Sequence, residues 1–505
     1  MRKICLLAFV FWACLVNGQD HYWSQQYGGE ATLTGGTAVV GVNDNSNVYY
    51  NPGASGFVDS ARITASTISL GLESIRLRNG AGTGLDLKNV GFNILPQLLA
   101  GTIVIKKVPK LRLVYGTLTR GRSNINLTQE NENSYDVISG SPGNEYYKAR
   151  VEYINNSLEQ WAGAGVGYKI NETWSVGLSI FGAYTHMEVR STENVNADAT
   201  AKGVPYTTTV NEYNAMTMDQ VTHMFKLGVA ARFKQMQLGI SLTPPGIKVW
   251  GQGRLEKSFE VYNLNQNAID TTVPAQKNAS YVISDVQAKL KTAYRIPLSA
   301  AIGIKLVYPG FTLSAALEYF MGYSSKTILR GTDRAVVHPA VVYGNDTISG
   351  FMVLQTAATW VLNGGIGAEV KVLPHLHLLL GARTDFSNHT DYLPGNSILN
   401  VSSAASPVWN YMYFSSGIAY KAGLNNLSVG FDYGLGFGGG KQEIYNITEP
   451  QQQTYLRGAI NQNIKTSVHK LNFILSYTYF FKAHEKRHGP FAAIGEGLKQ
   501  TEKKK

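Results

Sequence analysis

A run of glycines followed by a lysine, from Gly438 to Lys441, is the first candidate for chemistry, because Gly-rich loops can hold phosphate groups. The Walker A pattern also needs a glycine five residues before the last glycine, and a serine or threonine after the lysine. Leu435 and Gln442 stand at those positions. We therefore interpret the segment as a loop that follows a strand.

His375 and His377 are the second candidate, because a strand places alternate residues on one face and imidazoles bind metals. The first follows Pro374 at an expected turn, and no third ligand is spaced nearby. The chain also has no G-x-S-x-G nucleophile elbow. With no acid, base and nucleophile to assign, the sequence predicts a protein that is not an enzyme and binds no metal or cofactor.

Isolated charges within alternating segments are the third candidate. By alternation they point into the lumen of the barrel inferred below, where an unpaired charge is costly. We expect them to pair with one another or with an internal plug, although Arg383 or Arg62 could instead face the carboxylate of a ligand. The set comprises Arg62, Glu318, Glu369, Arg383, Asp385 and Asp432.

The composition of the 505-residue chain excludes several classes of protein. Charged residues make up 16% of the chain, against an average of roughly 25%, which argues against intrinsic disorder. Beyond the amino terminus, apolar residues never form the run of roughly 20 that a spanning helix needs. Of the formal charge of +11, a basic tail, residues 482–505, carries +4, with seven Lys or Arg against three Glu. The body has no basic stripe with aromatic platforms, so we expect no nucleic-acid partner.

Residues 1–18 have the features of a secretory signal peptide. A charged start precedes an apolar stretch from Ile4 to Val16 that ends in small residues, so the mature chain would begin at Gln19. A lipoprotein interpretation based on Cys14 is the alternative, but the residues before this cysteine form a poor recognition box. Cys5 and Cys14 are the only cysteines, so we expect neither disulfides nor thiolate metal sites in the mature protein.

From Arg62 to Phe481 the chain repeats segments of alternating apolar and small or polar residues, which is the pattern of β-strands. The connections alternate between turn-sized and long, and the long ones include 121–158, 191–218, 250–286 and 438–466. This sorting is typical of outer-membrane barrels, which have short periplasmic turns and long outer loops. A soluble β-sandwich, the alternative, has no reason to sort its connections by length.

The sequence thus predicts an all-β fold, a closed antiparallel transmembrane β-barrel over residues 62–481. An even number of strands would return both termini to the periplasm. We expect about fourteen strands, near residues 62–77, 90–105, 111–120, 159–169, 174–190, 219–233, 236–249, 287–307, 311–326, 352–371, 375–386, 409–421, 426–437 and 467–481.

Residues 19–61 do not alternate, and they contain two Gly-Gly pairs. A barrel of fourteen strands is too wide for side chains alone to fill, so a compact segment ahead of the first strand is a candidate plug. A flexible periplasmic leader is the alternative. Apolar residues between Val39 and Tyr50 favour the plug, because they need a buried place.

The stretch GGTAVVGVNDNSNVYYNPGASG, at 35–56, resembles the hatch signature of the long-chain fatty-acid transporter (FadL) family of outer-membrane proteins. LGISLTPPGIKVWGQG, at 238–253, resembles the Pro-interrupted middle strand of that family, and the segments 296–324 and 363–387 resemble later strand units. The hatch residues matched are Asp44, Ser46, Tyr50, Asn51 and Pro52, with Gly53 where the family usually has alanine.

The resemblance implies an outer-membrane channel, in a Gram-negative type of cell envelope, for passive uptake of long-chain fatty acids or aromatic hydrocarbons. It also implies a lateral opening in the wall beside a kinked strand. Pro96, Pro244 and Pro245 are the kink candidates, because proline removes a donor from the strand ladder. The expected partners are a hydrophobic ligand, outer-membrane lipid and lipopolysaccharide, and the barrel assembly machinery. Some relatives act in protein secretion, so the alternative is a docking or shuttle barrel with a secretion partner protein, which long polar loops and a basic tail would suit.

Overall fold

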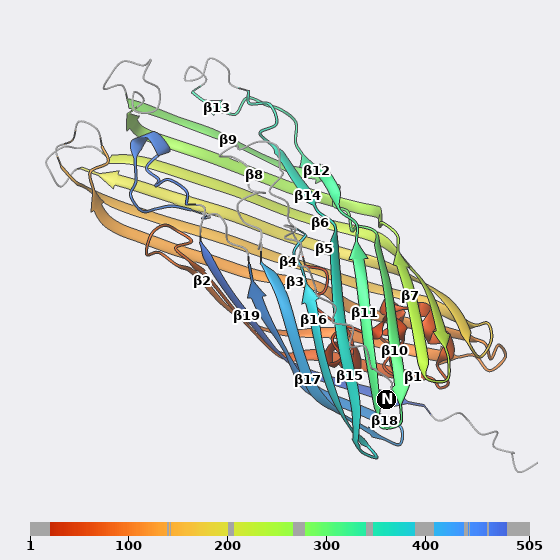
Figure 1. Cartoon of the computed structure of the whole chain (residues 1–505). Coiled ribbons are helices and arrows are strands. Elements are labelled where there is room, and N and C mark those ends of the chain that lie inside the picture. The colour runs from red at the N-terminus through yellow and green to blue at the C-terminus, as the bar shows by residue number, and fades with distance from the viewer. Residues whose placement is uncertain are drawn as a thin grey trace, which may run out of the picture.

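The computed structural model describes residues 21–138, 141, 143–199, 207–265, 278–339, 347–388, 409–438, 443, 445–461 and 464–481. The expected signal peptide, 1–18, the basic tail, 482–505, and most of the run from Gly438 to Lys441 lie outside these residues. The described strands form an antiparallel wall that closes on itself, because β1 (Arg62–Arg78) pairs with both β2 (Leu87–Val104) and β19 (Lys465–Phe480) (Figure 1).

In the described part of the chain the wall has fourteen strands, and four of them are interrupted along their length. β6 pairs with β7 near one end and with β8 further along, so β7 and β8 follow one path. The same holds for β9 with β10, β11 with β12 and β14 with β15. The prediction of a closed antiparallel barrel of about fourteen strands is therefore confirmed.

The remaining strands are β3 (Leu111–Tyr135), β4 (Glu145–Lys169), β5 (Trp174–Asp198), β6 (Thr207–Arg232), β7 (Met236–Thr243), β8 (Ile247–Asn265), β9 (Asn278–Lys291), β10 (Ser299–Tyr308), β11 (Phe311–Phe320), β12 (Tyr323–Arg330), β13 (Val337–His338), β14 (Val353–Ala358), β15 (Val361–Leu373), β16 (Leu376–Asp385), β17 (Asn410–Ala422) and β18 (Asn425–Phe437). β13 is a short addition that pairs with β9.

The residues between 21 and 61 lie inside one end of the barrel and form the predicted plug, here called the hatch (Figure 1). It contains α1 (Gly29–Leu33), η1 (Ala38–Val40), α2 (Asn47–Tyr50) and η2 (Pro52–Phe57). The hatch packs directly on wall backbone, because a Cβ at Gly177 would lie 2.3 Å from the carbonyl carbon of Pro52. Among the described residues, no helix is both long and apolar enough to cross a membrane.

The half of the wall around the hatch presents its apolar side chains outward. On β10, Ile302 and Ile304 are 55% and 38% exposed, whereas Ser299 and Ala301 on the same strand point inward and are buried. The strands next to β10 follow the same rule, with Ile240 and Leu317 exposed. This half therefore has an apolar outer face and an inner face of polar and small residues, which is the alternation expected of a strand that lines a polar lumen.

The alternation reverses in the other half of the wall, here called the far half. On β3 a bulge between Thr119 and Gly121 shifts the register by one residue, and such a shift exchanges the two faces of a strand. Beyond the bulge, Ile125 and Leu127 are buried while Asn124 and Asn126 are exposed. The far half thus encloses an apolar core and turns polar residues outward.

The prediction of long loops is wrong for three of the four segments, 121–158, 191–218 and 250–286, because the strands continue into them and stay paired. β3 and β4 stay paired up to Tyr135 opposite Glu145. β5 and β6 pair up to Asp198 opposite Thr207, and β8 and β9 up to Asn265 opposite Asn278. The reversed alternation is the reason: Asn, Thr and Glu on the outward positions give these strands the composition of loops.

The fourth expected long loop contains a segment that enters the far half of the lumen. This segment, residues 445–461 and here called the cap, buries Ile447 and Leu456 completely. The hydroxyl of Tyr147 donates to the backbone oxygen of Leu456 over 3.0 Å. Arg457 lies 2.9 Å from a carboxylate oxygen of Glu193 and 2.6 Å from one of Glu212, which ties the cap to β5 and β6.

Candidate functional site

The predicted hatch motif folds into a set of local hydrogen bonds. Asp44 accepts from the backbone N–H of Ser46 over 3.0 Å, and the Ser46 hydroxyl donates to the same oxygen. The hydroxyl of Tyr50 donates to Oε1 of Gln26 and accepts from the backbone N–H of Tyr27, both over 2.8 Å. The motif therefore ties the beginning of the hatch to its end.

The corner at Asn51, Pro52 and Gly53 joins the hatch to the wall. Asn51 caps η2, because its side-chain oxygen accepts from the N–H of Gly53 over 3.0 Å, and Pro52 occupies the first position, where a missing N–H costs nothing. The Asn51 amide donates to the oxygens of Val39 over 2.7 Å and of Val229 over 3.0 Å. One side chain thus links η2 to η1 and to β6.

Asp44 also carries the most unusual electrostatics in the hatch. Burial raises the pKa of its carboxyl from 3.8 to about 6, and the neighbouring carboxylate of Glu30 acts in the same direction. Hydrogen bonds from Ser46 lower the pKa but do not cancel this rise. The buried surroundings of Asp44 in the hatch therefore favour the protonated, neutral carboxyl more than water does.

Three of the predicted lumen charges bind the first residues of the hatch. Arg383 pairs with Asp432 through two hydrogen bonds of 2.6 and 2.8 Å, and it also donates to the backbone oxygen of Trp23 over 3.2 Å. Asp385 accepts from the backbone N–H of Trp23 over 3.0 Å. Glu318 accepts from the indole N–H of the same tryptophan over 2.7 Å.

Of the two remaining predicted charges, Arg62 contacts the hatch directly and Glu369 is linked to it through Lys421. Glu369 lies 2.5 Å from the amino group of Lys421, which lies 3.0 Å from Glu30 of α1. Arg62 donates to the backbone oxygen of Asn43. Wall charges therefore surround the hatch on several sides, and each has a counterpart within the protein.

His375 and His377 contact the wall residues of this set, Lys421 and Glu369. Nδ1 of His377 is 2.8 Å from the carboxylate of Glu369. Nδ1 of His375 is 3.0 Å from the backbone oxygen of Lys421. Both rings therefore have partners that account for their position at the turn between β15 and β16.

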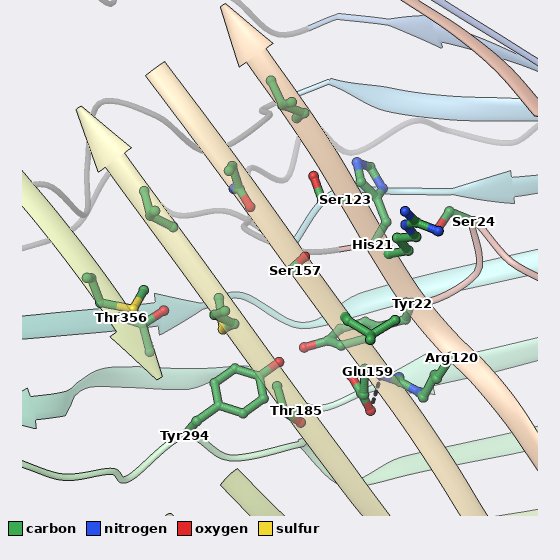
Figure 2. A pocket seen from close by; sticks show the side chains of 18 of the residues that line it. His21, Tyr22, Ser24, Arg120, Ser123, Ser157, Glu159, Thr185, Tyr294 and Thr356 are labelled. Atoms are coloured by element: carbon green, nitrogen blue, oxygen red, sulfur yellow. Dashed lines mark hydrogen bonds and ion pairs between the residues drawn. The ribbon is translucent and has the colours of Figure 1, made fainter. Parts of the chain in front are cut away.

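A cavity of about 170 Å³ lies in the lumen between the hatch and the core of the far half. Its lining combines hatch residues with wall residues, and several labelled members are drawn in Figure 2. His21 and Tyr22 come from the hatch, while Met216, Ile328 and Leu354 are among the apolar wall residues that line it. The cavity is therefore bounded by the hatch on one side and by the apolar interior on the other.

An ion pair between Arg120 and Glu159 lines this cavity (Figure 2). The guanidinium lies 3.1 and 3.2 Å from the two carboxylate oxygens, and the side chains are only 8% and 11% exposed. The guanidinium also lies over the rings of Tyr22 and Trp161, 5.5 and 5.4 Å from their centroids. Arg120 lies in the β3 bulge, between Thr119 and Gly121, and continues the inward positions of Val114 and Leu118.

The strand ladder of the wall is interrupted beside this ion pair. β2 and β3 pair from Val104 opposite Arg112 up to Leu98 opposite Leu118, and no backbone pairing joins these two described strands further along. The next contacts between them are hydrogen bonds from Asn126 to Asn89 and from Gln129 to Asp86, at 3.1 and 2.8 Å. We call the intervening stretch, residues 90–97 of β2 and 119–125 of β3, the wall window.

Pro96 lies at the hatch-side edge of the wall window, where its missing N–H cannot continue the ladder. A hollow at this edge is lined by Pro96, Leu98, Thr119 and Gln160, and by outward residues of β1 and β19. Thr119 and Gln160 directly adjoin Arg120 and Glu159 in the sequence, so the hollow and the lumen cavity lie on the two sides of the ion pair.

The hatch has a direct connection to the same edge. Gln97, fully buried beside Pro96, donates from its side-chain amide to the backbone oxygen of Gln26 over 2.9 Å. Gln26 in turn accepts the hydroxyl of Tyr50 from the hatch motif. A displacement of the hatch motif would therefore move Gln26 and, through it, Gln97 at the edge of the wall window.

Pro244 and Pro245 lie between β7 and β8, at a second break in the wall. The neighbouring path is also interrupted there, between β9 and β10. Side chains bridge this break: Lys248 donates to the backbone oxygen of Thr292 over 2.6 Å, and Gln220 donates to that of Tyr294 over 2.8 Å. The two predicted kink regions thus differ. At Pro244 side-chain hydrogen bonds join the neighbouring strands within the break, whereas at Pro96 the next hydrogen bonds between β2 and β3 lie past the end of the wall window.

Comparison with known proteins identifies the fold. No family model matches the sequence, and no curated protein matches it. Among solved structures, a Pseudomonas aeruginosa FadL homologue is 15% identical with a TM-score of 0.53, over 92% of this chain and 100% of that chain. The P. putida toluene transporter TodX is 13% identical with a TM-score of 0.52, over 91% and 99% of the two chains. These likenesses show that the chain has the fold of FadL-type barrels, as the hatch signature indicated.

Proposed function

We propose that the protein is an outer-membrane channel through which hydrophobic small molecules enter the cell passively. The apolar outer face of the hatch half suits the hydrocarbon layer of a bilayer, and the polar outer face of the far half suits the cell exterior. In this orientation the hatch and both termini face the periplasm. The chain would reach the membrane through the signal peptide at 1–18 and the barrel assembly machinery.

The observation that carries this proposal is the wall window beside the lumen cavity. The hatch occupies the direct path along the barrel, so a solute in the cavity has a shorter way out between β2 and β3. In the lipid zone, unpaired strand edges are tolerated only where protein or a cavity covers them. A window that joins the cavity to the membrane satisfies that condition, and it lets an apolar solute pass into lipid without crossing water.

This arrangement favours Pro96 over Pro244 and Pro245 as the site of the lateral opening. The strand ladder ends next to Pro96, whereas polar side chains bridge the break at Pro244. We therefore propose that solutes leave the barrel between β2 and β3.

Within the class of fatty acids and hydrocarbons, the cavity favours compact aromatic hydrocarbons. Its volume of about 170 Å³ is close to that of an engineered protein cavity of about 150 Å³ that binds benzene. The two arginines considered as partners for a ligand carboxylate, Arg383 and Arg62, are held by Asp432 and by the backbone oxygen of Asn43. The solved toluene transporter TodX has the same fold.

Uptake by intact cells tests the proposal, because the lipopolysaccharide leaflet blocks apolar solutes that pass freely through ordinary phospholipid. A Gram-negative host would express the protein or carry the empty vector, and the entry of radiolabelled toluene, oleate and a small sugar would be timed. We expect faster entry of toluene, a smaller gain for oleate and none for the sugar. Equal entry of toluene in both strains would overturn the proposal.

A further inference from the structure

Six basic residues lie on the outer surface of the wall, on the side formed by β8, β9 and β12. Five of them are exposed and Lys326 is half-buried. We call this set the basic patch. It comprises Arg254, Lys289, Lys291, Arg295, Lys326 and Arg330.

The pairing of the strands brings these residues together. Lys291 lies opposite Gln252, and Arg254 falls in the bulge between two β8–β9 pairs, next to Lys289. Ala293 donates its N–H to the oxygen of Ile328 over 2.8 Å, and this contact sets the path after β9 against β12. Since the two paths run in opposite directions, Lys291 then lies near the level of Arg330.

The patch has few counter-charges. Glu256 lies 2.7 Å from Arg254, and Asp285 lies 3.9 Å from Arg334, just beyond the patch. The hairpin of β3 and β4 gives a contrast, because its outward charges alternate across the strands as Glu130 with Arg150 and Glu132 with Lys148. Like charges on adjacent strands destabilise a sheet unless an anion neutralises them.

One member of the patch also has a strained backbone. Lys289 has a φ of 57°, in the left-handed region that residues other than glycine seldom adopt. The strain lies at the bulge in the β8–β9 register, and the Lys289 side chain there is exposed. The wall thus holds a cationic side chain outward at a backbone cost.

The patch lies directly beyond the apolar outer face, on the side away from the hatch. On β8, Ile247, Val249 and Trp250 are 61%, 54% and 46% exposed, and the exposed Arg254 follows four residues after Trp250. On the path of β11 and β12, Met321 is 53% exposed and precedes Lys326. In the orientation proposed above, this level is that of the headgroups in the outer leaflet.

We propose that the basic patch binds the phosphate groups of lipopolysaccharide. Arginine offers a planar fork that pairs with phosphate through two hydrogen bonds, and lysine adds compact charge. The inference depends on the proposed function in one respect, the orientation that puts the patch on the outer side of the membrane. A lipid held there would fix the wall on the side away from the wall window.

The test uses the full-length protein in detergent and measures its affinity for lipid A with two phosphates, for dephosphorylated lipid A and for phosphatidylglycerol. Each basic residue near an anionic surface contributes a factor of about five, so the variant K289Q/K291Q/R295Q should bind diphosphorylated lipid A about a hundredfold more weakly. The control K88Q/K148Q/R150Q removes the same charge from outward positions on β2 and β4 and should bind as the native protein does.

Equal affinity of the triple variant and the native protein would overturn the inference, as would equal binding of dephosphorylated lipid A. Binding of phosphatidylglycerol as tight as that of lipid A would overturn the choice of lipopolysaccharide. Heat-modifiable migration would show that each barrel is folded. Since lipid A binding in detergent does not depend on transport, a native protein that admits toluene but does not bind lipid A contradicts the patch alone. A native protein that binds lipid A but does not admit toluene contradicts the channel alone.

Discussion

The ion pair between Arg120 and Glu159 should act as a barrier between the lumen cavity and the wall window. Both side chains line the cavity, and the next residues, Thr119 and Gln160, line the hollow at the window. A solute that moves from one to the other must pass the pair. We therefore expect its removal to change transport and stability in a defined way.

The magnitudes follow from the burial of the pair. Removing one member of a buried ion pair costs about 3–5 kcal/mol, because the other charge is left without its partner. Arg120→Met should lie at the low end, since the indole of Trp161 still donates to Glu159 over 2.6 Å. The double variant Arg120→Met/Glu159→Met should recover most of this loss, because two apolar side chains of similar length replace the pair.

Transport should respond in the opposite direction. A hydrogen bond to a charged group contributes about 1.5–3 kcal/mol. If a solute must break the pair to pass, its removal should speed passage about tenfold to a hundredfold, until another step limits the rate. The double variant should therefore take up toluene at least about tenfold faster than the native protein at the same folded amount.

Unfolding in urea, followed by heat-modifiable migration, would measure stability, and toluene entry into intact cells would measure transport. The control Glu132→Met/Lys148→Met removes an ion pair whose members are 58% and 51% exposed, and it should change neither quantity. A stable Arg120→Met single variant, or a double variant with unchanged or slower toluene entry, would refute the barrier.

Three further predictions concern the hatch and the cap. Asn51→Ala removes three side-chain hydrogen bonds, to Val39, Val229 and Gly53, each contributing about 1 kcal/mol. Hydrogen exchange in residues 39–50 should therefore speed up and uptake should fall while the barrel migrates normally; unchanged uptake would contradict it. Arg457→Met leaves two buried carboxylates without their cation, so proteases should cut the cap in intact cells while the wall stays resistant. Because burial raises the pKa of Asp44 from 3.8 to about 6, the folded hatch binds more protons between these values, so its protection from exchange should fall as pH rises through this window; Asp44→Asn should remove that dependence.

The sequence was sufficient to predict the wall and the hatch. Alternation at period two is a direct consequence of a strand with two different faces, so all fourteen predicted strands have a counterpart. The hatch was predicted from the opposite signal, a Gly-rich segment without alternation before a barrel too wide to fill. Both inferences depend on local pattern and on size.

The predicted strand ends were wrong where the two faces exchange roles. The β3 bulge at Thr119 changes the parity of the strand, and the outward residues beyond it are polar, so the pattern looked like the start of a loop. Arg120 and Glu159 lie at these predicted strand ends, which is why the sequence did not indicate their pairing. The contacts of Glu318, Asp385 and Trp23 depend on how the hatch sits in the lumen, and no local pattern contains that information.

Closing the wall window tests the central claim most directly. Thr119 is only 2% exposed and lines the hollow at the window, so Thr119→Trp would fill the window with a large ring. Thr128→Trp would place the same ring at an exposed position further along β3. With equal amounts of folded barrel in intact cells, we predict that Thr119→Trp reduces toluene entry nearly to the level of the empty vector and that Thr128→Trp does not. Native entry with Thr119→Trp would contradict an exit between β2 and β3.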